Sequence, residues 1–436
     1  MFRFSAPPAA RLAILLPALV LGSCGGDSTG AIITVPNFLV VADLNNDGLM
    51  DVAIVVAQID ETGLTQKPGL LGVELNSKTS PGTFGVGTNY VTSSAPPSGL
   101  AVGDLSGTGT HDLVVANLNA GTLAVFKETS PTSGAYAQAV TITVGGGPND
   151  VEIADINGDG LPDLVVADNT GAVEYLLQNP ASPGTFEAPV KLPISNPAIT
   201  AEGLVARGIS VAIGDLNGDG VPDLAVTSFD AEGDYGQVTI FWNNPSQPGT
   251  FLATPTNITA YGEPSQIKIA DVNQDHVNDI VIACQGLGLL ADASQDPSTQ
   301  AFQESLFGAM VILQNSASPG TFAAPVVNTG ISGAISLAIA DLNQDGLPDI
   351  AMSSLYPSGQ GTIGVMLQNP AAPGTFTLTL SIAAAGQPAA IAIGDLNGDG
   401  LPDLVVADAT SAEWYVNSAT SPGTFALQAQ IGSFLQ

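Results

Sequence analysis

Groups of closely spaced carboxylates recur along this sequence in a nine-residue pattern. The segment Asp155–Asp163 reads DINGDGLPD, with side-chain oxygens at positions 1, 3, 5 and 9 and glycine at position 6. Ca²⁺ takes roughly six to eight hard oxygen ligands, and the backbone carbonyl of position 7 can supply one of them. Glycine at position 6 permits the positive φ that the bend requires. Without a cation, three carboxylates held this close would repel one another.

The pattern occurs seven times. A hairpin turn explains part of it, because Asn-Gly and Asp-Gly favour such turns unaided. However, a bare turn needs no oxygen at four fixed positions, and six of the seven copies keep Asp, Asn, Asp and Asp there. We therefore predict about six Ca²⁺ sites. Their expected ligands are Asp43, Asn45, Asp47, Leu49 and Asp51; Asp155, Asn157, Asp159, Leu161 and Asp163; Asp215, Asn217, Asp219, Val221 and Asp223; Asp271, Asn273, Asp275, Val277 and Asp279; Asp341, Asn343, Asp345, Leu347 and Asp349; and Asp395, Asn397, Asp399, Leu401 and Asp403.

Two copies depart from the common pattern. The second copy runs from Asp104 to Asp112 and has Ser106 and Thr108 in place of Asn and Asp, so we expect an empty or weak site there. The fifth copy keeps its ligands but has His276 at position 6, where positive φ is less favourable than for glycine. None of the copies is an EF-hand, because that loop needs Glu at position 12 and a following helix.

A second motif, PGTF, recurs in step with the first, and a degenerate form, SPTSGAY, completes a set of seven. Self-similarity at a period of ~50–70 residues is typical of repeat architectures. One pair of motifs therefore marks each structural unit. Counted with the preceding residue, the second motif starts at Ser80, Ser130, Ser182, Gln247, Ser318, Ala372 and Ser421.

Each unit divides into four predicted strands. The first precedes the Asp loop, as in Val211–Gly214, and alternates with a period of two. The second follows the loop as a continuous apolar run such as Leu164–Ala167, which indicates burial on both faces. The third resembles Val238–Trp242, and a more polar fourth strand such as Ala324–Val327 contains proline, which suits an outer edge. The sequence therefore predicts an all-β, seven-bladed propeller of four-stranded antiparallel blades, with the calcium loops between strands 1 and 2.

The Asp loops and the four-strand units resemble the FG-GAP/VCBS repeats of integrin α-subunit propellers and of many bacterial surface proteins. The resemblance covers roughly residues 35–436. It implies the same fold and calcium as its cofactor. It defines function poorly, because propellers of this type serve as adhesins, lectin-like modules and enzyme-associated domains.

The N-terminus has the layout of a secretory signal peptide. Arg3 and Arg11 precede the apolar run Leu12–Leu21, which is too short to span a bilayer. The stretch Leu21-Gly22-Ser23-Cys24 resembles the lipobox of bacterial lipoproteins, and this resemblance implies cleavage before Cys24 and lipidation of its thiol. We expect a lipoprotein signal peptide over residues 1–23, a spacer over 24–34 and the propeller over 35–436. The protein is then exported and lipid-anchored to a bacterial membrane or cell surface; with an ordinary signal peptide it would be secreted.

Composition excludes some partners. The chain carries 40 acidic and 8 basic residues, a formal net charge of −32, and no Lys or Arg follows Lys268. A surface of this sign repels nucleic acid and anionic lipid. Hydrophobic residues make up 45% of the chain, too many for a disordered acidic protein. We expect a monomer that touches the membrane through its lipid anchor alone.

The connections on the two rims of the predicted propeller differ. Asp loops and PGTF turns share one rim, and the connections between strands 2 and 3 and between successive units share the other. The second rim varies in length, and function tends to lie in such loops on a rigid scaffold. Its aromatic and acidic residues suit a sugar or a basic peptide. The candidate ligand residues are Phe229, Asp230, Asp234, Tyr235, Asp292, Asp296, Phe302 and Phe307.

Catalysis has little support in the sequence. The histidines, His111 and His276, both lie inside Asp loops, and Cys284 ends a predicted buried strand. We therefore expect a non-catalytic surface protein that binds an extracellular glycan or protein through the variable rim. A polysaccharide-degrading enzyme or enzyme-associated domain, with paired carboxylates on that rim, is the first alternative. A passive scaffold of a surface assembly is the second.

Overall fold

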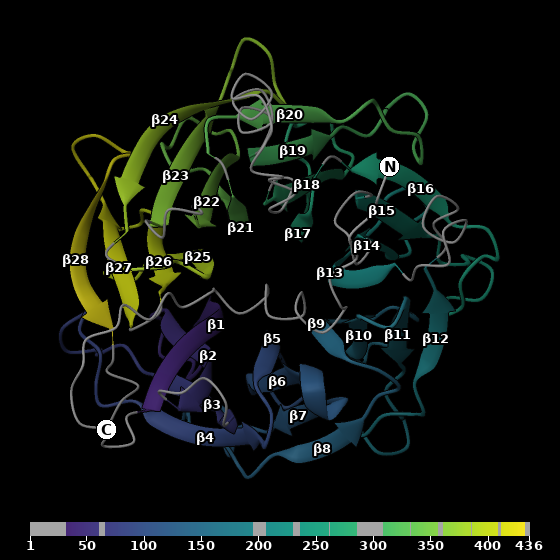
Figure 1. The fold of residues 1–436 in the computed structure, drawn as a ribbon, viewed down its shortest axis with the longest axis horizontal. Coiled ribbons are helices and arrows are strands. Elements are labelled where there is room, and N and C mark those ends of the chain that lie inside the picture. Colours follow the sequence, from purple (N-terminus) through teal and green to yellow (C-terminus); the bar gives the residue numbers. More distant parts are fainter. Residues whose placement is uncertain are drawn as a thin grey trace, which may run out of the picture.

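Seven four-stranded antiparallel sheets are arranged in a ring around a central axis in the computed structural model (Figure 1). The structure describes residues 32–60, 66–194, 206–229, 236–260, 262–285, 308–331, 333–355, 361–384, 386–408 and 411–431. Each sheet is one blade and is built from consecutive strands of the chain. The predicted all-β, seven-bladed propeller is therefore confirmed.

The strands occupy equivalent places in every blade, with the first nearest the axis and the fourth at the periphery (Figure 1). The innermost strands are β1 (Ile32–Ala42), β5 (Pro97–Gly103), β9 (Pro148–Ala154), β13 (Arg207–Gly214), β17 (Pro264–Ala270), β21 (Ala334–Ala340) and β25 (Ala390–Gly394). The second strands are β2 (Asp51–Asp60), β6 (Asp112–Asn117), β10 (Asp163–Asp168), β14 (Asp223–Phe229), β18 (Asp279–Cys284), β22 (Asp349–Leu355) and β26 (Asp403–Ala407).

The third and fourth strands complete each blade. The third strands are β3 (Gln66–Glu74), β7 (Thr122–Phe126), β11 (Ala172–Leu176), β15 (Gly236–Phe241), β19 (Gly308–Ile312), β23 (Gly361–Gln368) and β27 (Ala412–Asn417). The fourth strands are β4 (Thr88–Ser93), β8 (Val140–Thr143), β12 (Val190–Pro193), β16 (Thr256–Ala260), β20 (Val326–Thr329), β24 (Phe376–Ala383) and β28 (Phe425–Ile431). One 3₁₀ turn, η3 (Leu118–Ala120), joins β6 to β7.

Burial follows the predicted strand roles. Every residue of the second strands β6, β10 and β18 is buried, as a continuous apolar run between two neighbouring blades requires. The fourth strand β8 is largely exposed, with one half-buried residue. Apolar side chains fill the space between each pair of adjacent blades, which gives the molecule seven wedge-shaped core layers instead of one central core.

Small residues before the Asp loops let the innermost strands approach one another. A Cβ at Gly214 would lie 2.8 Å from the Ile269 side chain of the next blade, and one at Gly394 would lie 2.5 Å from Val41. Both distances are below what real Cβ contacts show. The Ala or Gly that precedes each loop in the sequence is therefore a packing requirement of the ring.

Polar side chains also tie neighbouring inner strands. Ser210 Oγ on β13 donates to Asp150 Oδ2 on β9 at 2.7 Å, and burial raises the pKa of Asp150 to about 6. Lys268 Nζ on β17 pairs with Glu152 on β9 at 3.2 Å, so this ion pair joins blade 3 to blade 5 past blade 4. These polar contacts between inner strands thus help to hold blades 3, 4 and 5 together.

The ring closes without a strand shared between its first and last blades. Ile32, Ile33 and Thr34 pair with β2 of their own blade and not with the last sheet. Blades 7 and 1 lie side by side in Figure 1, and β1 contacts β25. An apolar layer that includes Leu39 and Trp414 therefore closes the ring, together with the hydrogen bond from Asn76 Nδ2 to Leu396 O at 2.7 Å.

Candidate calcium loops and the opposite rim

The third Asp loop shows how the backbone positions the predicted ligands. Asp155 accepts N–H bonds from Gly158 at 2.7 Å and Gly160 at 2.8 Å, one on each carboxylate oxygen. Asp159 Oδ1 accepts the Leu161 N–H at 2.9 Å. Asp163 Oδ2 accepts the N–H of position 2 in the same loop. These bonds gather the acidic side chains over one turn of the chain.

The loops need two residues with positive φ, at positions 4 and 6. His276 has φ 72° at position 6, as the sequence predicted for that histidine. Position 4 was not predicted, although it has positive φ even where it is Asn46, Gln274 or Gln344. Such values are uncommon for residues other than glycine, and asparagine tolerates them best. The bends therefore impose strain that the surrounding hydrogen bonds must hold in place.

The ninth-position aspartates are fully buried. Burial raises the pKa of Asp51 and of Asp223 to about 7, although two backbone N–H bonds to each carboxylate act in the opposite direction. The negative charge of positions 1 and 5 contributes to the increase. The same causes raise the pKa to about 6 in Asp163, Asp279, Asp349 and Asp403.

This donor set fits calcium in the kind of its oxygen ligands. Four hard side-chain oxygens and one carbonyl lie within nine residues, and a divalent cation would offset the mutual repulsion of three carboxylates. In the part of the chain that the structure describes, no three His, Cys, Asp or Glu side chains are arranged as a finished metal site. Their oxygens accept backbone N–H bonds instead, and each carboxylate oxygen has a second lone pair for a ligand bond. Calcium at six of these loops therefore stays a prediction.

The second loop differs chemically from the other six. Ser106 Oγ, Thr108 Oγ1 and Thr110 Oγ1 hydrogen-bond to one another at 2.8 to 3.3 Å. Burial works against ionisation of Asp104, but backbone N–H bonds hold its pKa below the ordinary value. Hydroxyl groups thus replace one amide and one carboxylate in this loop, and a weak or empty site at Asp104, Ser106, Thr108 and Asp112 stays a prediction.

A bridging amide was missed by the sequence analysis. In blade 4, the Asn243 N–H donates to Asp223 Oδ1 at 2.8 Å, and Asn243 Oδ1 accepts the Gly249 N–H of the PGTF turn at 3.0 Å. Its Nδ2 donates to Pro222 O, at position 8 of the Asp loop. One side chain therefore joins the Asp loop to the turn between strands 3 and 4. Its equivalents are Asn76, Gln178, Gln314, Gln368 and Asn417.

In blade 2, a carboxylate instead of an amide joins the Asp loop to the turn between strands 3 and 4. Glu128 takes the bridging position, but it cannot donate to the carbonyl of position 8. Its Oε2 instead accepts the His111 N–H at 2.9 Å, and Oε1 accepts the Gly134 N–H at 3.0 Å. Position 8 is proline in four other loops, and proline has no N–H. Glu128 at the bridging position therefore depends on a residue with an N–H at position 8, and His111 provides it.

Most of the opposite rim that the sequence analysis singled out lies outside the described residues. Asp230, Asp234, Tyr235, Asp292, Asp296, Phe302 and Phe307 lie there, and so do Cys24 and the predicted signal peptide. Phe229 is described: it is half-buried at the end of β14 and pairs with Gly236. The strand ends that these connections join lie on the rim away from the Asp loops.

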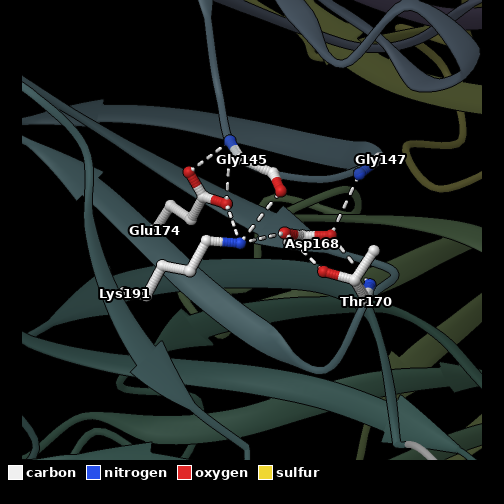
Figure 2. A network of polar contacts seen from close by, with 6 residues as sticks. All are labelled: Gly145, Gly147, Asp168, Thr170, Glu174 and Lys191. Carbon is white, nitrogen blue, oxygen red and sulfur yellow. Dashed lines mark hydrogen bonds and ion pairs between the residues drawn. The ribbon is translucent and has the colours of Figure 1, made fainter.

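A described part of that rim carries a polar network in blade 3 (Figure 2). Lys191 on β12 reaches Glu174 at 2.9 Å and Asp168 at 3.4 Å, and both carboxylates are almost fully buried. Burial opposes ionisation of Asp168, yet hydrogen bonds with Glu174 and Thr170 hold its pKa below the ordinary value. Glu174 also accepts the Gly145 N–H, so the network fixes the connection that enters blade 3. The charges of Lys191, Asp168 and Glu174 therefore pair with one another and stabilise this part of the rim.

The remaining reactive side chains occupy structural positions. Cys284 is buried, and burial raises the pKa of its thiol to about 12, in keeping with an inert core thiol. Trp414 is buried in the core layer between blades 7 and 1. Trp242 packs against a core layer, and its Nε1 donates to Thr256 Oγ1 at 2.9 Å. Both tryptophans therefore contribute to packing between blades, Trp414 as a buried core residue and Trp242 as a half-buried one.

The ring of sheets, with Asp loops and PGTF turns bonded together on one rim, defines a seven-bladed β-propeller of repeated loop–strand units. The FG-GAP-like repeat family matches residues 104–166, 155–226 and 215–282, and the FG-GAP repeat matches residues 388–412. The chain is an FG-GAP-repeat propeller of the integrin α-like kind.

One relative is similar to this chain in sequence, and one solved structure is similar to it in fold. Integrin alpha-V of Gallus gallus is 30% identical over 213 residues, which are 46% of this chain and 20% of the relative. The chain thus matches about a fifth of that relative's length. A putative 6-phosphogluconolactonase from Bacteroides uniformis superposes with a TM-score of 0.52 over 93% of this chain and 98% of its own, at 12% identity. At that identity the likeness shows the fold alone. No helix among the described residues is long and apolar enough to cross a membrane.

Proposed function

We propose that the protein is a calcium-stabilised recognition module outside the cell, which binds a glycan or protein ligand through the rim opposite the Asp loops. The observation that carries this proposal is a difference between the two rims of the propeller. On one rim, the bridging amides hydrogen-bond to the Asp loops and the PGTF turns. The side chains of this rim therefore stabilise the fold. The other rim joins the same rigid strands through connections of unequal length, such as the one between β18 and β19.

Calcium has a structural role in this proposal. A metal that binds only the folded state stabilises that state by mass action. Six loops carry the full oxygen set, and each set is anchored to a turn by a bridging amide. The likeness to an integrin α chain supports recognition as the general role, and it supports an extracellular or surface location. Export with a lipid on Cys24 is the anchoring we propose.

The test is a binding screen of the purified protein against arrays of polysaccharides and extracellular proteins, first with calcium and then with chelator. Retention of one ligand class in calcium, without release of products, would support the recognition module. Degradation of the ligand would replace it with the enzyme alternative. Absence of binding to every array member would favour a passive scaffold.

The ligand rim has its own test. Alanine substitutions of Phe229, Asp292 and Phe302 should weaken binding at least ~10-fold, since aromatic anchors dominate binding energy. Calcium content should stay unchanged, because none of these residues belongs to an Asp loop. Loss of binding on substitution of the Asp-loop rim alone would place the ligand on the wrong face for the proposal.

A further inference from the structure

One glutamate replaces an apolar core residue at the place where the ring closes. In each third strand, the residue two before the bridging position is buried. Six blades have an apolar or aromatic residue there, and blade 1 has Glu74, which is 3% exposed. The six equivalents are Phe126, Leu176, Phe241, Ile312, Met366 and Tyr415.

Register confirms that these positions are equivalent. Glu74 pairs with Val52, the residue after the ninth-position aspartate, and Leu176 pairs with Leu164 in the same way. Directly opposed residues of antiparallel strands point to the same face of a sheet. Val52 lies in the core layer between blades 7 and 1, together with Trp414, whereas Val73 lies in the layer between blades 1 and 2. The Glu74 side chain therefore faces blade 7.

The surroundings of Glu74 make room for its carboxyl group but provide no partner for it. A Cβ at Gly87 would lie 2.0 Å from Glu74 Oε1, so a larger residue there would displace the carboxyl group. Glu74 Oε2 is buried and makes no hydrogen bond within the described residues. Desolvation of the carboxylate is the cause that raises the pKa of Glu74 to about 7.

The neighbouring elements bring no cation to this carboxyl group. Asp51 precedes Val52, the residue that pairs with Glu74, and Lys78 follows Glu74 by four residues in the chain. Lys78 Nζ donates to Asp47 O. Within the described part of the chain, each ion pair involves Lys191 or Lys268, and none involves Glu74.

We propose that Glu74 makes closure of the ring sensitive to pH, so that its ionisation loosens the contact between blades 7 and 1. That contact closes the ring, and it is held by the apolar layer that Glu74 faces together with the hydrogen bond from Asn76 Nδ2 to Leu396 O. For a carboxyl group whose folded-state pKa lies above its unfolded value, the folded state binds the proton more tightly. Stability is therefore lost as pH rises from about 4.5 toward 7.

The experiment compares thermal unfolding of the wild type with that of Glu74→Leu and Glu74→Gln from pH 5.5 to 8.5, in saturating calcium. Leucine is the residue that blade 3 has at this position, so the variant should fold. The melting temperature of Glu74→Leu should exceed that of the wild type by about 3–6 °C at pH 8. The difference should shrink toward pH 5.5, and Glu74→Gln should lose the pH dependence as well. Glu187→Gln, which removes an exposed glutamate, is the matched control and should keep the wild-type profile.

A second measurement locates the effect. Trp414 lies in the closing layer, so in a Trp242→Phe background its fluorescence reports on the contact between blades 7 and 1. As pH rises, its emission should shift to the red at a lower temperature than the loss of strand signal in circular dichroism. The same background with Glu74→Leu should show coincident transitions. Parallel pH profiles of wild type and Glu74→Leu, or a lower melting temperature of Glu74→Leu at all pH values, would overturn the proposal.

Discussion

Asp159, a predicted calcium ligand, is held in place by hydrogen bonds within its own loop. Its Oδ1 accepts the Leu161 N–H, and its Oδ2 accepts a hydrogen bond from Asn157 Nδ2. The side chain is thus held over the loop while its charge helps to raise the pKa of Asp163. Removal of Asp159 should therefore reduce its repulsion of Asp163 and also remove one predicted calcium ligand.

Calcium stoichiometry provides the first prediction. Asp159→Ala should reduce bound calcium by one ion out of about six, because the loop loses its central carboxylate. Metal analysis after dialysis, together with titration calorimetry, would measure the change. Thr108→Ala in the second loop is the control and should leave the stoichiometry unchanged. An equal loss in both variants would contradict the assignment of ligands.

Blade 2 provides a second prediction at the scale of single residues. His111→Pro removes the N–H that Glu128 Oε2 accepts, so a buried carboxylate oxygen loses its partner and the protein should be destabilised by about 1–3 kcal/mol. Adding Glu128→Gln should recover at least ~1 kcal/mol, because the amide can donate to the carbonyl of position 8 as in the other blades. Urea denaturation of the four proteins measures this coupling. If His111→Pro cost the same in both backgrounds, the two residues would be independent.

At the scale of the element, each Asp loop is joined to its PGTF turn through the bridging amide. The Asn243 side chain reaches further than this: its Nδ2 donates to Ile156 O in the Asp loop of the preceding blade at 2.8 Å. Asn76 and Asn417 make the same contact with the Asp loop of the preceding blade. Three blades are thus linked through these rim contacts to their neighbours.

The bridging residues should therefore differ in their contribution to stability. Asn243→Ala should lower the free energy of unfolding by about 2–3 kcal/mol, because two carbonyls and one N–H lose their partner. Gln178→Ala should cost about 1–2 kcal/mol, since its amide serves its own blade. Chemical denaturation gives both values. Asn244→Ala, at the neighbouring half-buried position, removes one hydrogen bond from the Ser246 N–H and is the control for asparagine removal; a cost equal to that of Asn243→Ala would refute the bridge.

Local patterns predicted the elements well, and they failed where distant segments meet. The period of two before each Asp loop and the apolar run after it yielded the strands, because both patterns lie within one segment. Asn243 carries no comparable signal alone, since its partners at Ile156 and Gly249 come from another blade and another turn. A recurring Asn or Gln six residues before the glycine of PGTF was the signal available in the sequence. Glu74 could be recognised only once the third strands were aligned by register.

At the scale of the whole molecule, the six buried aspartates of the predicted calcium loops should make stability depend on calcium and pH together. Chelation should lower the melting temperature by at least ~10 °C, because the metal stabilises the folded state alone. In chelator, stability should fall as pH rises from about 4 to 7, since the folded-state pKa of Asp51, Asp223 and their equivalents lies above the ordinary value. Saturating calcium should reverse this trend, because it favours the ionised carboxylates. Scanning calorimetry over this pH range, with and without calcium, measures both effects, and an unchanged melting temperature on chelation would refute the structural role of the metal.

Because each sheet is one uninterrupted segment, the order of blades in the chain is also their order in space. New termini placed in any connection between consecutive blades would cut no hydrogen-bonded ladder, so circular permutants should remain competent to fold. By the same reasoning, duplication of one unit in the gene adds a complete sheet and never half of one. A ring without a shared blade can therefore gain or lose whole units during evolution, provided that its closing contact, where Glu74 lies, accommodates the new curvature.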